Sequence, residues 1–471
     1  MRPEYVSVPA NYQVTGVTRY LGNPFIEALP PLEQTKNQIL DRIRNTPPPP
    51  TRAARKLGEL VRIAEVGCIN EIVYPFAEYK RAGVNLTTNI REAYVGRNPL
   101  SVEDLQRRHA IALQNDGSIP FPKNWISTAK GQSLLGISGS GKTTFATAFA
   151  LPYLIVIEHT EYNGKPLNVR QIPWVGLRMS HDATLKSLCL QFFSTVDGIL
   201  KNTTYLRQAE SVGSIARMVM LIAKVADAVS IGAIFIDEVQ NLKAAVGKNA
   251  TFVLNLFSEI IERAGVTLVI AGTPAVESVI HENVRNLRKL NSGGESNFVQ
   301  MRLDDPEFDA FTDLYWDYQY VKNPRPLDTD TRKAWHSAGA GNPAFTALAF
   351  MLAQRNEIGG REVIDKDAFD RVAKIDMAIL EPAIRALRSG KASKLRDFDD
   401  LLFKSGCKEL RKLIAWSDGD DDKPANPEEF DEIPPEQNSV TPGQPASAKT
   451  TPRLKKPVEP VSLPTENPLI Q

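Results

Sequence analysis

The sequence predicts an α/β fold in which a mainly parallel sheet carries helices on both faces. Apolar runs typical of buried strands alternate with helical patterns, as in folds of this class. Three of the runs lead into polar residues: a glycine-rich loop after 133–135, an acidic pair after 233–236, and a threonine near the end of 266–274. Open α/β sheets place ligands at the carboxyl ends of their strands, so these residues are the first candidates for a site.

The glycine-rich loop is GISGSGKTTF, residues 136–145, and it fits the pattern G-x-x-x-x-G-K-[ST]. Its glycines let successive backbone N–H groups turn toward anionic oxygens, and the helix that follows adds the positive end of its dipole. Lys142 is expected to neutralise the β- and γ-phosphates of a nucleotide, while the Thr143 hydroxyl reaches Mg²⁺. The predicted nucleotide-binding residues are Gly136, Ser138, Gly139, Ser140, Gly141, Lys142, Thr143 and Thr144.

The acidic pair lies in AIFIDEVQNL, residues 233–242. The run 233–236 is typical of a buried parallel strand, which places Asp237 and Glu238 at its carboxyl end. We expect Asp237, together with Thr143, to hold Mg²⁺, and Glu238 to orient and polarise an attacking water. Two acids at this position could instead cap a helix, but the phosphate loop favours the catalytic interpretation.

The other elements follow in order along the chain. After the loop and its helix (144–150) we expect a hairpin-like pair of strands with a turn at Asn163-Gly164, then helices and strands that complete the sheet. In sequence order these elements are strands 153–158 and 172–178, a helix over 182–199, a second helix before the Asp237 strand, a helix over 250–264 and a last strand over 298–303. Residues 306–415 are expected to be all-helical, and the helical spacing of Phe308, Phe311 and Tyr315 indicates core packing rather than nucleic-acid stacking.

Three segments resemble known ATPases. They are GNPFIEALPP at 22–31, GISGSGKTT at 136–144, and the pair IFIDEVQNL and LVIAGTP within 234–274. The core resembles AAA+ ATPases, and the chain is most similar to the TnsC/TniB family of transposition regulators, relatives of MuB and of the IstB and DnaC loaders. Without that resemblance, 22–31 would be interpreted only as a proline-bounded docking loop.

The resemblance implies an AAA+ P-loop NTPase core that binds ATP and Mg²⁺ and hydrolyses ATP. It further implies a homo-oligomeric ring or filament on double-stranded DNA that links a TniQ/TnsD-like target-selection protein to the transposase subunits, in the bacterial cytoplasm at the nucleoid. In AAA+ ATPases the position of Thr273 senses the γ-phosphate, although a Thr-Pro turn alone would explain this residue. The predicted catalytic residues are then Glu238, Asp237, Thr273, Arg288 and Arg285.

The two arginines are predicted because a basic residue after the sensor strand reaches the neighbouring subunit's γ-phosphate in AAA+ assemblies. Arg288 is the first choice and Arg285 the second. Positive charge at a helix C-terminus explains both equally well, because it is favoured by the helix dipole. Many AAA+ proteins also carry a nucleotide-sensing arginine beside the position of GAGNP, residues 339–343, and this chain has none there.

We expect four regions. Residues 1–120 form a mainly helical N-terminal extension that docks partners, 121–305 the ATPase core, 306–415 a helical lid, and 416–471 a disordered tail rich in proline and acidic residues. Pro47 to Pro50 form a stiff break within the extension.

Composition limits the function classes. The 471 residues carry a formal net charge of +1, so DNA binding must depend on local patches that contact the backbone. Lys165 and Lys186 are the candidate DNA contacts. The three cysteines lie far apart without metal-ligand spacing, and no apolar run approaches the length of a membrane span, so we expect no membrane contact.

Two alternative functions remain open: an AAA+ helicase loader or replication initiator, and a nucleotide switch that does not hydrolyse ATP.

Overall fold

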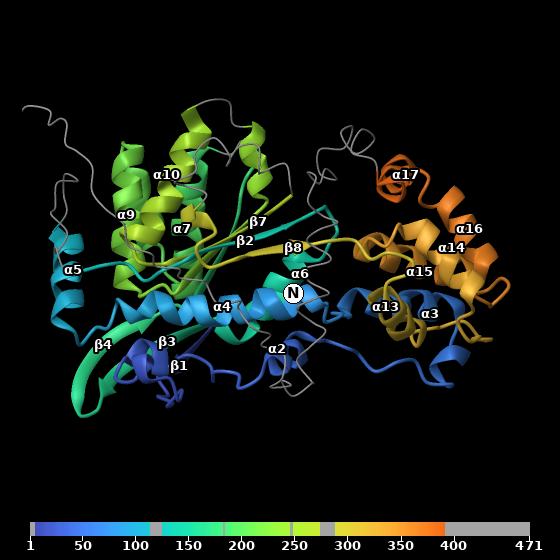
Figure 1. Ribbon diagram of the computed structural model, residues 1–471, viewed down its shortest axis with the longest axis horizontal. Helices are drawn as coiled ribbons and strands as arrows, with labels where there is room; N and C mark the ends of the chain where they lie inside the picture. Colours follow the sequence, from blue (N-terminus) through green and yellow to red (C-terminus); the bar gives the residue numbers. More distant parts are fainter. Residues whose placement is uncertain (1–4, 114–124, 182–183, 245–247, 274–287, 391–471) are drawn as a thin grey trace, which may run out of the picture. The chain divides into compact units, whose positions relative to one another are not determined.

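A five-stranded parallel sheet lies at the centre of the protein (Figure 1). Its strands, in spatial order, are β5 (Trp174–Arg178), β6 (Ala233–Asp237), β7 (Thr267–Gly272), β2 (Gly131–Gly136) and β8 (Glu295–Phe298). Every neighbouring pair is parallel. The computed structural model describes residues 5–113, 125–181, 184–244, 248–273 and 288–390, all within one unit that spans 1–412.

Helices cover both faces of this sheet. Successive residues of β6 alternate between two apolar clusters: Ile234 and Ile236 belong to one, Ala233 and Phe235 to the other. The first cluster includes α7 (Leu185–Leu200), α9 (Ile215–Ala228) and α10 (Lys248–Glu262). The second includes α1 (Pro24–Glu27), α2 (Lys36–Ile43), α4 (Ala77–Val95) and α6 (Lys142–Ala150). The predicted α/β fold is therefore confirmed.

A smaller sheet corrects one pairing predicted from the sequence. β3 (Ile155–Tyr162) and β4 (Lys165–Gln171) form the antiparallel hairpin, and β1 (Val6–Pro9) lies parallel to β3. The Asn163-Gly164 turn is where we expected it, with positive φ at both residues, as a two-residue hairpin turn requires. The prediction that 172–178 is the second hairpin strand is wrong. Pro173, which has no N–H to donate, separates β4 from β5, and β5 pairs with β6 in the central sheet.

The last strand was also predicted too far along the chain. β8 ends at Phe298, where the sequence suggested a strand over 298–303. The backbone N–H of Met301 instead donates to Gly341 O at 2.9 Å, so this segment joins the helical region.

The segment 22–31 packs inside the protein. Residues 23–29 are buried, with Phe25 against the rings of Tyr94 and His159. Asn23 caps α1 and donates its Nδ2 to Tyr94 O at 2.7 Å. This stretch is therefore a structural element that attaches the extension to the core, and partner docking by 1–120 stays a prediction for its exposed residues.

Five helices form the described part of the lid: α13 (Pro306–Trp316), α14 (Thr329–Gly339), α15 (Pro343–Glu357), α16 (Lys366–Lys374) and α17 (Glu381–Ser389). Phe308, Phe311 and Tyr315 are buried, so the expected core packing is confirmed. The same apolar cluster takes in Val66 and Ile69 of the extension. The rest of the predicted lid and the predicted tail lie outside the described residues.

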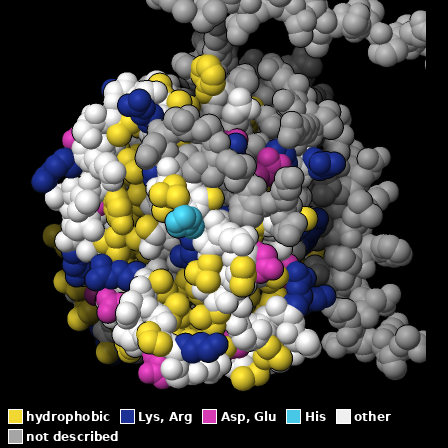
Figure 2. Space-filling view, turned by 90° about the vertical axis from the view of Figure 1, so that its left-hand side faces the viewer, with side chains coloured by type: hydrophobic (Ala, Val, Ile, Leu, Met, Phe, Trp, Pro, Cys, Tyr) yellow, Lys and Arg dark blue, Asp and Glu magenta, His cyan; other side chains and the backbone are white. Residues whose placement is uncertain are grey.

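Three further α-helices among the described residues are α3 (Glu59–Glu65), α5 (Val102–Leu113) and α8 (Thr204–Ser211). α5 is held to α9 by Arg107, whose guanidinium lies 2.7 Å from Asp104 and 2.5 Å from Asp227. Figure 2 views this side of the molecule, where Lys and Arg side chains are scattered among apolar and acidic ones instead of forming one basic patch. No helix among the described residues is long and apolar enough to cross a membrane.

A buried ion pair joins the extension to the lid. Both terminal nitrogens of Arg62 on α3 bond the Glu362 carboxylate at 2.7 Å, and Nη1 also donates to Tyr320 O at 3.0 Å. The hydrogen bonds from Arg62 lower the pKa of Glu362 to about 2. Because the guanidinium is fully buried, the pair is costly to break from one side only.

Replacing Arg62 with methionine removes the buried cation and leaves the Glu362 carboxylate with only the exposed Lys322, whose Nζ lies 3.7 Å away. We expect the free energy of unfolding at pH 7, measured by urea denaturation, to fall by about 3–5 kcal/mol. A carboxylate whose pKa is lowered from 4.5 to about 2 contributes stability above pH 4.5 and loses that contribution as the pH falls toward 2. The difference in unfolding free energy between variant and wild type should therefore shrink over this range.

Arg385→Met, which breaks an exposed pair with Glu381, is the control and should cost at most about 1 kcal/mol. Equal losses in both variants would contradict the assignment.

Candidate nucleotide-binding site

The loop 136–145 connects β2 to α6 and is held in a conformation that requires glycine. Gly139 and Gly141 have φ of +78° and +95°, which other residues rarely adopt. A Cβ at Gly141 would lie 2.5 Å from the Tyr79 hydroxyl. Lys142 is buried at the start of α6, and its Nζ donates to Gly136 O at 2.7 Å and Ile137 O at 2.9 Å. The lysine thus spans the loop and places its charge on the concave side, where the oxygens of an anion would bind.

The structure brings the two predicted metal-binding residues together. Thr143 Oγ1 donates to Asp237 Oδ2 at 2.7 Å, although 94 positions separate them in the chain. This contact arises because β6, β7 and β2 are neighbours, so their carboxyl ends meet at one edge. A hydroxyl beside a carboxylate is a set of hard oxygen donors, which fits Mg²⁺.

Glu238 is fixed in an unusual backbone conformation directly after this edge. Its φ is +60°, its N–H bonds Asp237 Oδ1 at 2.9 Å, and its carbonyl accepts from Asn241 N at 3.0 Å. The carboxylate accepts from Arg178 Nη2 at 3.1 Å and from the Gln240 side chain. Non-glycine residues with positive φ persist where the surroundings hold them, and such residues gather at functional sites.

Two buried hydroxyls at this edge have no hydrogen-bond partner among the residues that the structure describes: Ser140 Oγ in the loop and Thr273 Oγ1 after β7. The backbone N–H of Thr273 is bonded to Gln240 Oε1 at 3.2 Å, which orients the residue and leaves its hydroxyl unpaired. Buried polar groups normally have a hydrogen-bond partner. Two unpaired hydroxyls at the same edge as Lys142 are therefore evidence for a polar ligand. Together with the Thr143–Asp237 pair, these groups fit a nucleotide triphosphate with its metal ion.

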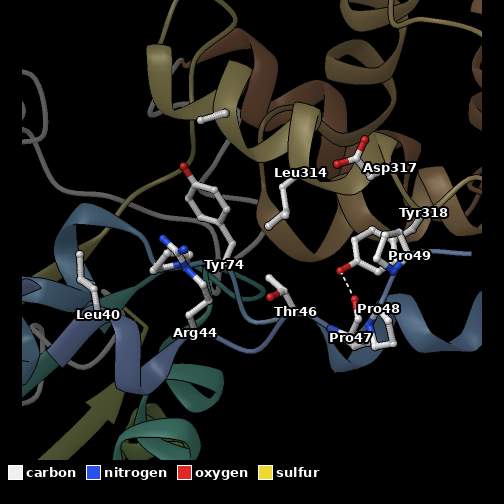
Figure 3. A pocket seen from close by; sticks show the side chains of 12 residues that line it. Leu40, Arg44, Thr46, Pro47, Pro48, Pro49, Tyr74, Leu314, Asp317 and Tyr318 are labelled. Carbon is white, nitrogen blue, oxygen red and sulfur yellow. Dashed lines mark hydrogen bonds between the residues drawn. The ribbon is translucent and has the colours of Figure 1, made fainter. Parts of the chain in front are cut away.

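A cavity of about 440 Å³ with a mixed polar and apolar lining adjoins the loop, and the aromatic side chains in its walls suit a nucleotide base. Its floor includes Gly139 and Gly141 to Thr144, and its walls come from the extension and the lid: Ile69, Asn70, Ile72, Tyr74, Phe76, Tyr79, Phe311, Tyr315, Pro343, Ala344, Ala347, Leu348 and Met351. A larger cavity of about 580 Å³ lies between residues 46–49 and α13, where Tyr318 bonds Pro47 O (Figure 3). No residue of the phosphate loop lines that second cavity, so we assign the nucleotide to the first.

Several residues of the site were not predicted from the sequence. Tyr79 donates its hydroxyl to Gly141 O at 2.9 Å, and burial raises the pKa of this phenol, which keeps it a donor. Arg178 and Gln240 hold Glu238, and Asn342 contacts the loop from the lid. No local sequence pattern indicates a role for Tyr79, Arg178 or Gln240. Asn342 does have such a pattern, because asparagine before proline is typical of a helix start.

The other predicted residues lie apart from this site or outside the described chain. Lys165 begins β4 and Lys186 lies on α7, both with exposed side chains. Arg288 is exposed, and Arg285 lies outside the described residues.

The arrangement has groups of the kinds that phosphoryl transfer requires. Lys142 and the loop N–H groups would bind negative charge, Thr143 and Asp237 would supply oxygen ligands for a divalent cation, and Glu238 would orient water.

Replacing Glu238 with glutamine keeps the side chain's shape and removes its charge. We expect nucleotide binding to persist while ATP turnover falls by about 100-fold or more, since a positioned base contributes on this scale. Lys142→Ala should weaken binding itself. Fluorescent-nucleotide titration and phosphate release separate the two effects, and full turnover in the Glu238 variant would refute the assignment.

Thr273→Val removes the orphaned hydroxyl. Because that group has no partner to lose, stability should be unchanged or slightly higher, whereas turnover should fall by about 10- to 100-fold. Thr267→Val on the same strand is the matched control, since the Thr267 hydroxyl bonds Asn89 O at 2.8 Å. It should lower the melting temperature and leave turnover intact; the opposite pattern would exclude a role for Thr273 in turnover.

The core of this chain is similar to a known domain family. The family model described as an AAA domain matches residues 127–280. Among solved structures, a Walker-type ATPase of Pyrococcus abyssi aligns at 12% identity over 60% of this chain and 83% of its own, with a TM-score of 0.36. The Aeropyrum pernix ORC1 protein, solved in complex with DNA, aligns at 15% identity over 62% and 77%, with a TM-score of 0.34. A search of curated proteins gives no match. The chain thus contains an AAA-type P-loop ATPase domain over residues 127–280.

Proposed function

We propose that this protein is an ATP-dependent regulator of DNA transposition that oligomerises on double-stranded DNA and links a target-selection protein to the transposase. The observation that carries the ATP-dependent part is the edge where Lys142, Thr143, Asp237 and Thr273 meet, because it joins phosphate-binding, metal-binding and sensing groups. Glu238 completes the set for hydrolysis. A nucleotide switch without turnover would not need a carboxylate held at this point.

The transposition part is supported by the N-terminal segment 22–31. The support is its resemblance to TnsC/TniB regulators. In the structure, Asn23 and Phe25 attach this segment to α4, the same helix whose Tyr79 contacts the phosphate loop. A helicase loader or replication initiator shares the ATPase core, and the N-terminal segment favours the transposition regulator over it.

Assembly through a trans-acting arginine is supported by the surroundings of Arg288. Its neighbour Lys289 is used internally, since Lys289 Nζ lies 2.5 Å from Glu262 Oε1, and Leu290 is buried. Arg288 alone of these three residues has an exposed side chain. An exposed guanidinium of this kind is available to a phosphate held by a neighbouring subunit.

DNA binding in this proposal uses backbone contacts spread over the oligomer. The net charge of +1 gives the chain little overall attraction for DNA, and the basic side chains on the face in Figure 2 are scattered. Repetition of a few exposed lysines, such as Lys165 and Lys186, along a ring or filament would multiply a weak attraction for phosphates.

With duplex DNA and a non-hydrolysable ATP analogue, we expect rings or filaments by electron microscopy, and binding that weakens steeply with salt but depends little on DNA sequence. Arg288→Ala should retain nucleotide binding and lose DNA-stimulated hydrolysis by at least about tenfold. Arg207→Ala, an exposed arginine on α8, is the matched control. We also expect a transposase in a neighbouring reading frame, and that transposase should be captured on the coated DNA.

Monomers alone under these conditions, or strong preference for one short sequence at high salt, would argue against the assembly. DNA coating without capture of the transposase would favour the loader or initiator.

A further inference from the structure

The lid contacts the phosphate loop through a neutral side chain. Asn342 is fully buried, and both ends of its carboxamide are engaged. Oδ1 accepts from the N–H groups of Ala344 at 3.1 Å and Phe345 at 3.3 Å, which caps α15. Nδ2 donates to Ser138 O at 2.8 Å. The carboxamide orientation follows from its partners, since donors face one end and an acceptor faces the other.

A second bond and a steric constraint reinforce this contact. The N–H of Ala344 also lies 3.2 Å from Gly139 O. A Cβ on Gly139 would lie 2.6 Å from Asn342 Oδ1, so the lid requires glycine at this position independently of its positive φ. From the other side, Met301 N bonds Gly341 O at 2.9 Å. The turn that precedes α15 is therefore held between the phosphate loop and the segment that leads into the lid.

The Asn342 bond sets the direction of a loop N–H group. In a trans peptide the C=O and N–H point in opposite directions. The carbonyl of Ser138 points at the lid, so the N–H of Gly139, in the same peptide unit, points away from it. Any movement of the lid that breaks the Asn342 bond frees this peptide to rotate.

Several of the lid's described arginines are engaged in ion pairs within the lid. Arg332 bonds Asp309 and Asp313, Arg371 bonds Glu357, and Arg385 bonds Glu381. Ala344, beside the cap, lines the nucleotide cavity and has no charge.

We infer that Asn342 is a positioning residue for ATP turnover: it couples the lid to the phosphate loop by holding the Ser138–Gly139 peptide. A neutral amide does this by fixing the backbone, where a cation would act on the phosphate directly. The inference rests on the ATP-hydrolysis part of the proposed function and does not depend on transposition.

Asn342→Asp tests the inference because aspartate caps a helix as well as asparagine does. The substitution keeps the cap and replaces the donor facing Ser138 O with an acceptor. We expect nucleotide affinity to fall about tenfold and kcat to fall by a similar factor. The melting temperature should fall as well, because the new carboxylate is buried against the Ser138 carbonyl. Asn342→Ser, which also caps but is too short to reach Ser138, should show a smaller loss in both quantities.

Asp328→Asn is the control, because it makes the reverse exchange at the cap of α14, where Asp328 accepts from Thr331 N at 2.8 Å. It should leave affinity and kcat unchanged. Wild-type affinity and kcat in both Asn342 variants would overturn the inference, as would a fall in melting temperature without any kinetic change. Absence of ATP binding and turnover in the wild type would instead refute the proposed function.

Discussion

The backbone of the phosphate loop is bonded from two other parts of the chain, and the rest of the structure depends on that arrangement. Tyr79 from the extension bonds Gly141 O, and Asn342 from the lid bonds Ser138 O. A loop rich in glycine has the largest conformational entropy to lose on ordering, so fixed partners for its carbonyls are needed to keep its N–H groups aimed at a ligand. The glycines let Tyr79 and Asn342 approach the loop closely, and these two contacts order the loop backbone.

This arrangement explains why the extension and the lid share an apolar cluster and a nucleotide cavity. Both supply walls of the cavity next to the loop, and they are tied together at its outer side by the Arg62–Glu362 pair and by Glu307, which accepts from Ala77 N at 2.8 Å. A ligand in this cavity contacts three regions of the chain at once. Occupancy of the cavity is therefore expected to favour one relative position of extension, core and lid.

Local patterns sufficed to predict the features that depend on neighbouring residues. The loop has a strong sequence signature, the runs before Asp237 and Thr273 are apolar as buried strands are, and the parallel sheet then brings Thr143 to Asp237. The hairpin was misassigned because one apolar run conceals the break at Pro173. Tyr79 and Arg178 could not be predicted, since each acts through a partner about 60 residues away, and no pattern in one sequence encodes such a contact. The roles of Lys165, Lys186 and Arg288 stay predictions because one chain shows exposure but no partner.

The central claim is that nucleotide binds on the 136–145 loop between extension and lid. A structure of the protein with a non-hydrolysable ATP analogue and Mg²⁺ tests it most directly. The account predicts the phosphates on this loop, with Lys142 Nζ turned from Gly136 O to the ligand, the metal between Thr143 and Asp237, and the base against Ile72 and Phe76. Nucleotide bound in the cavity beside Pro47 and Tyr318, or bound with the lid detached from Ser138, would contradict it.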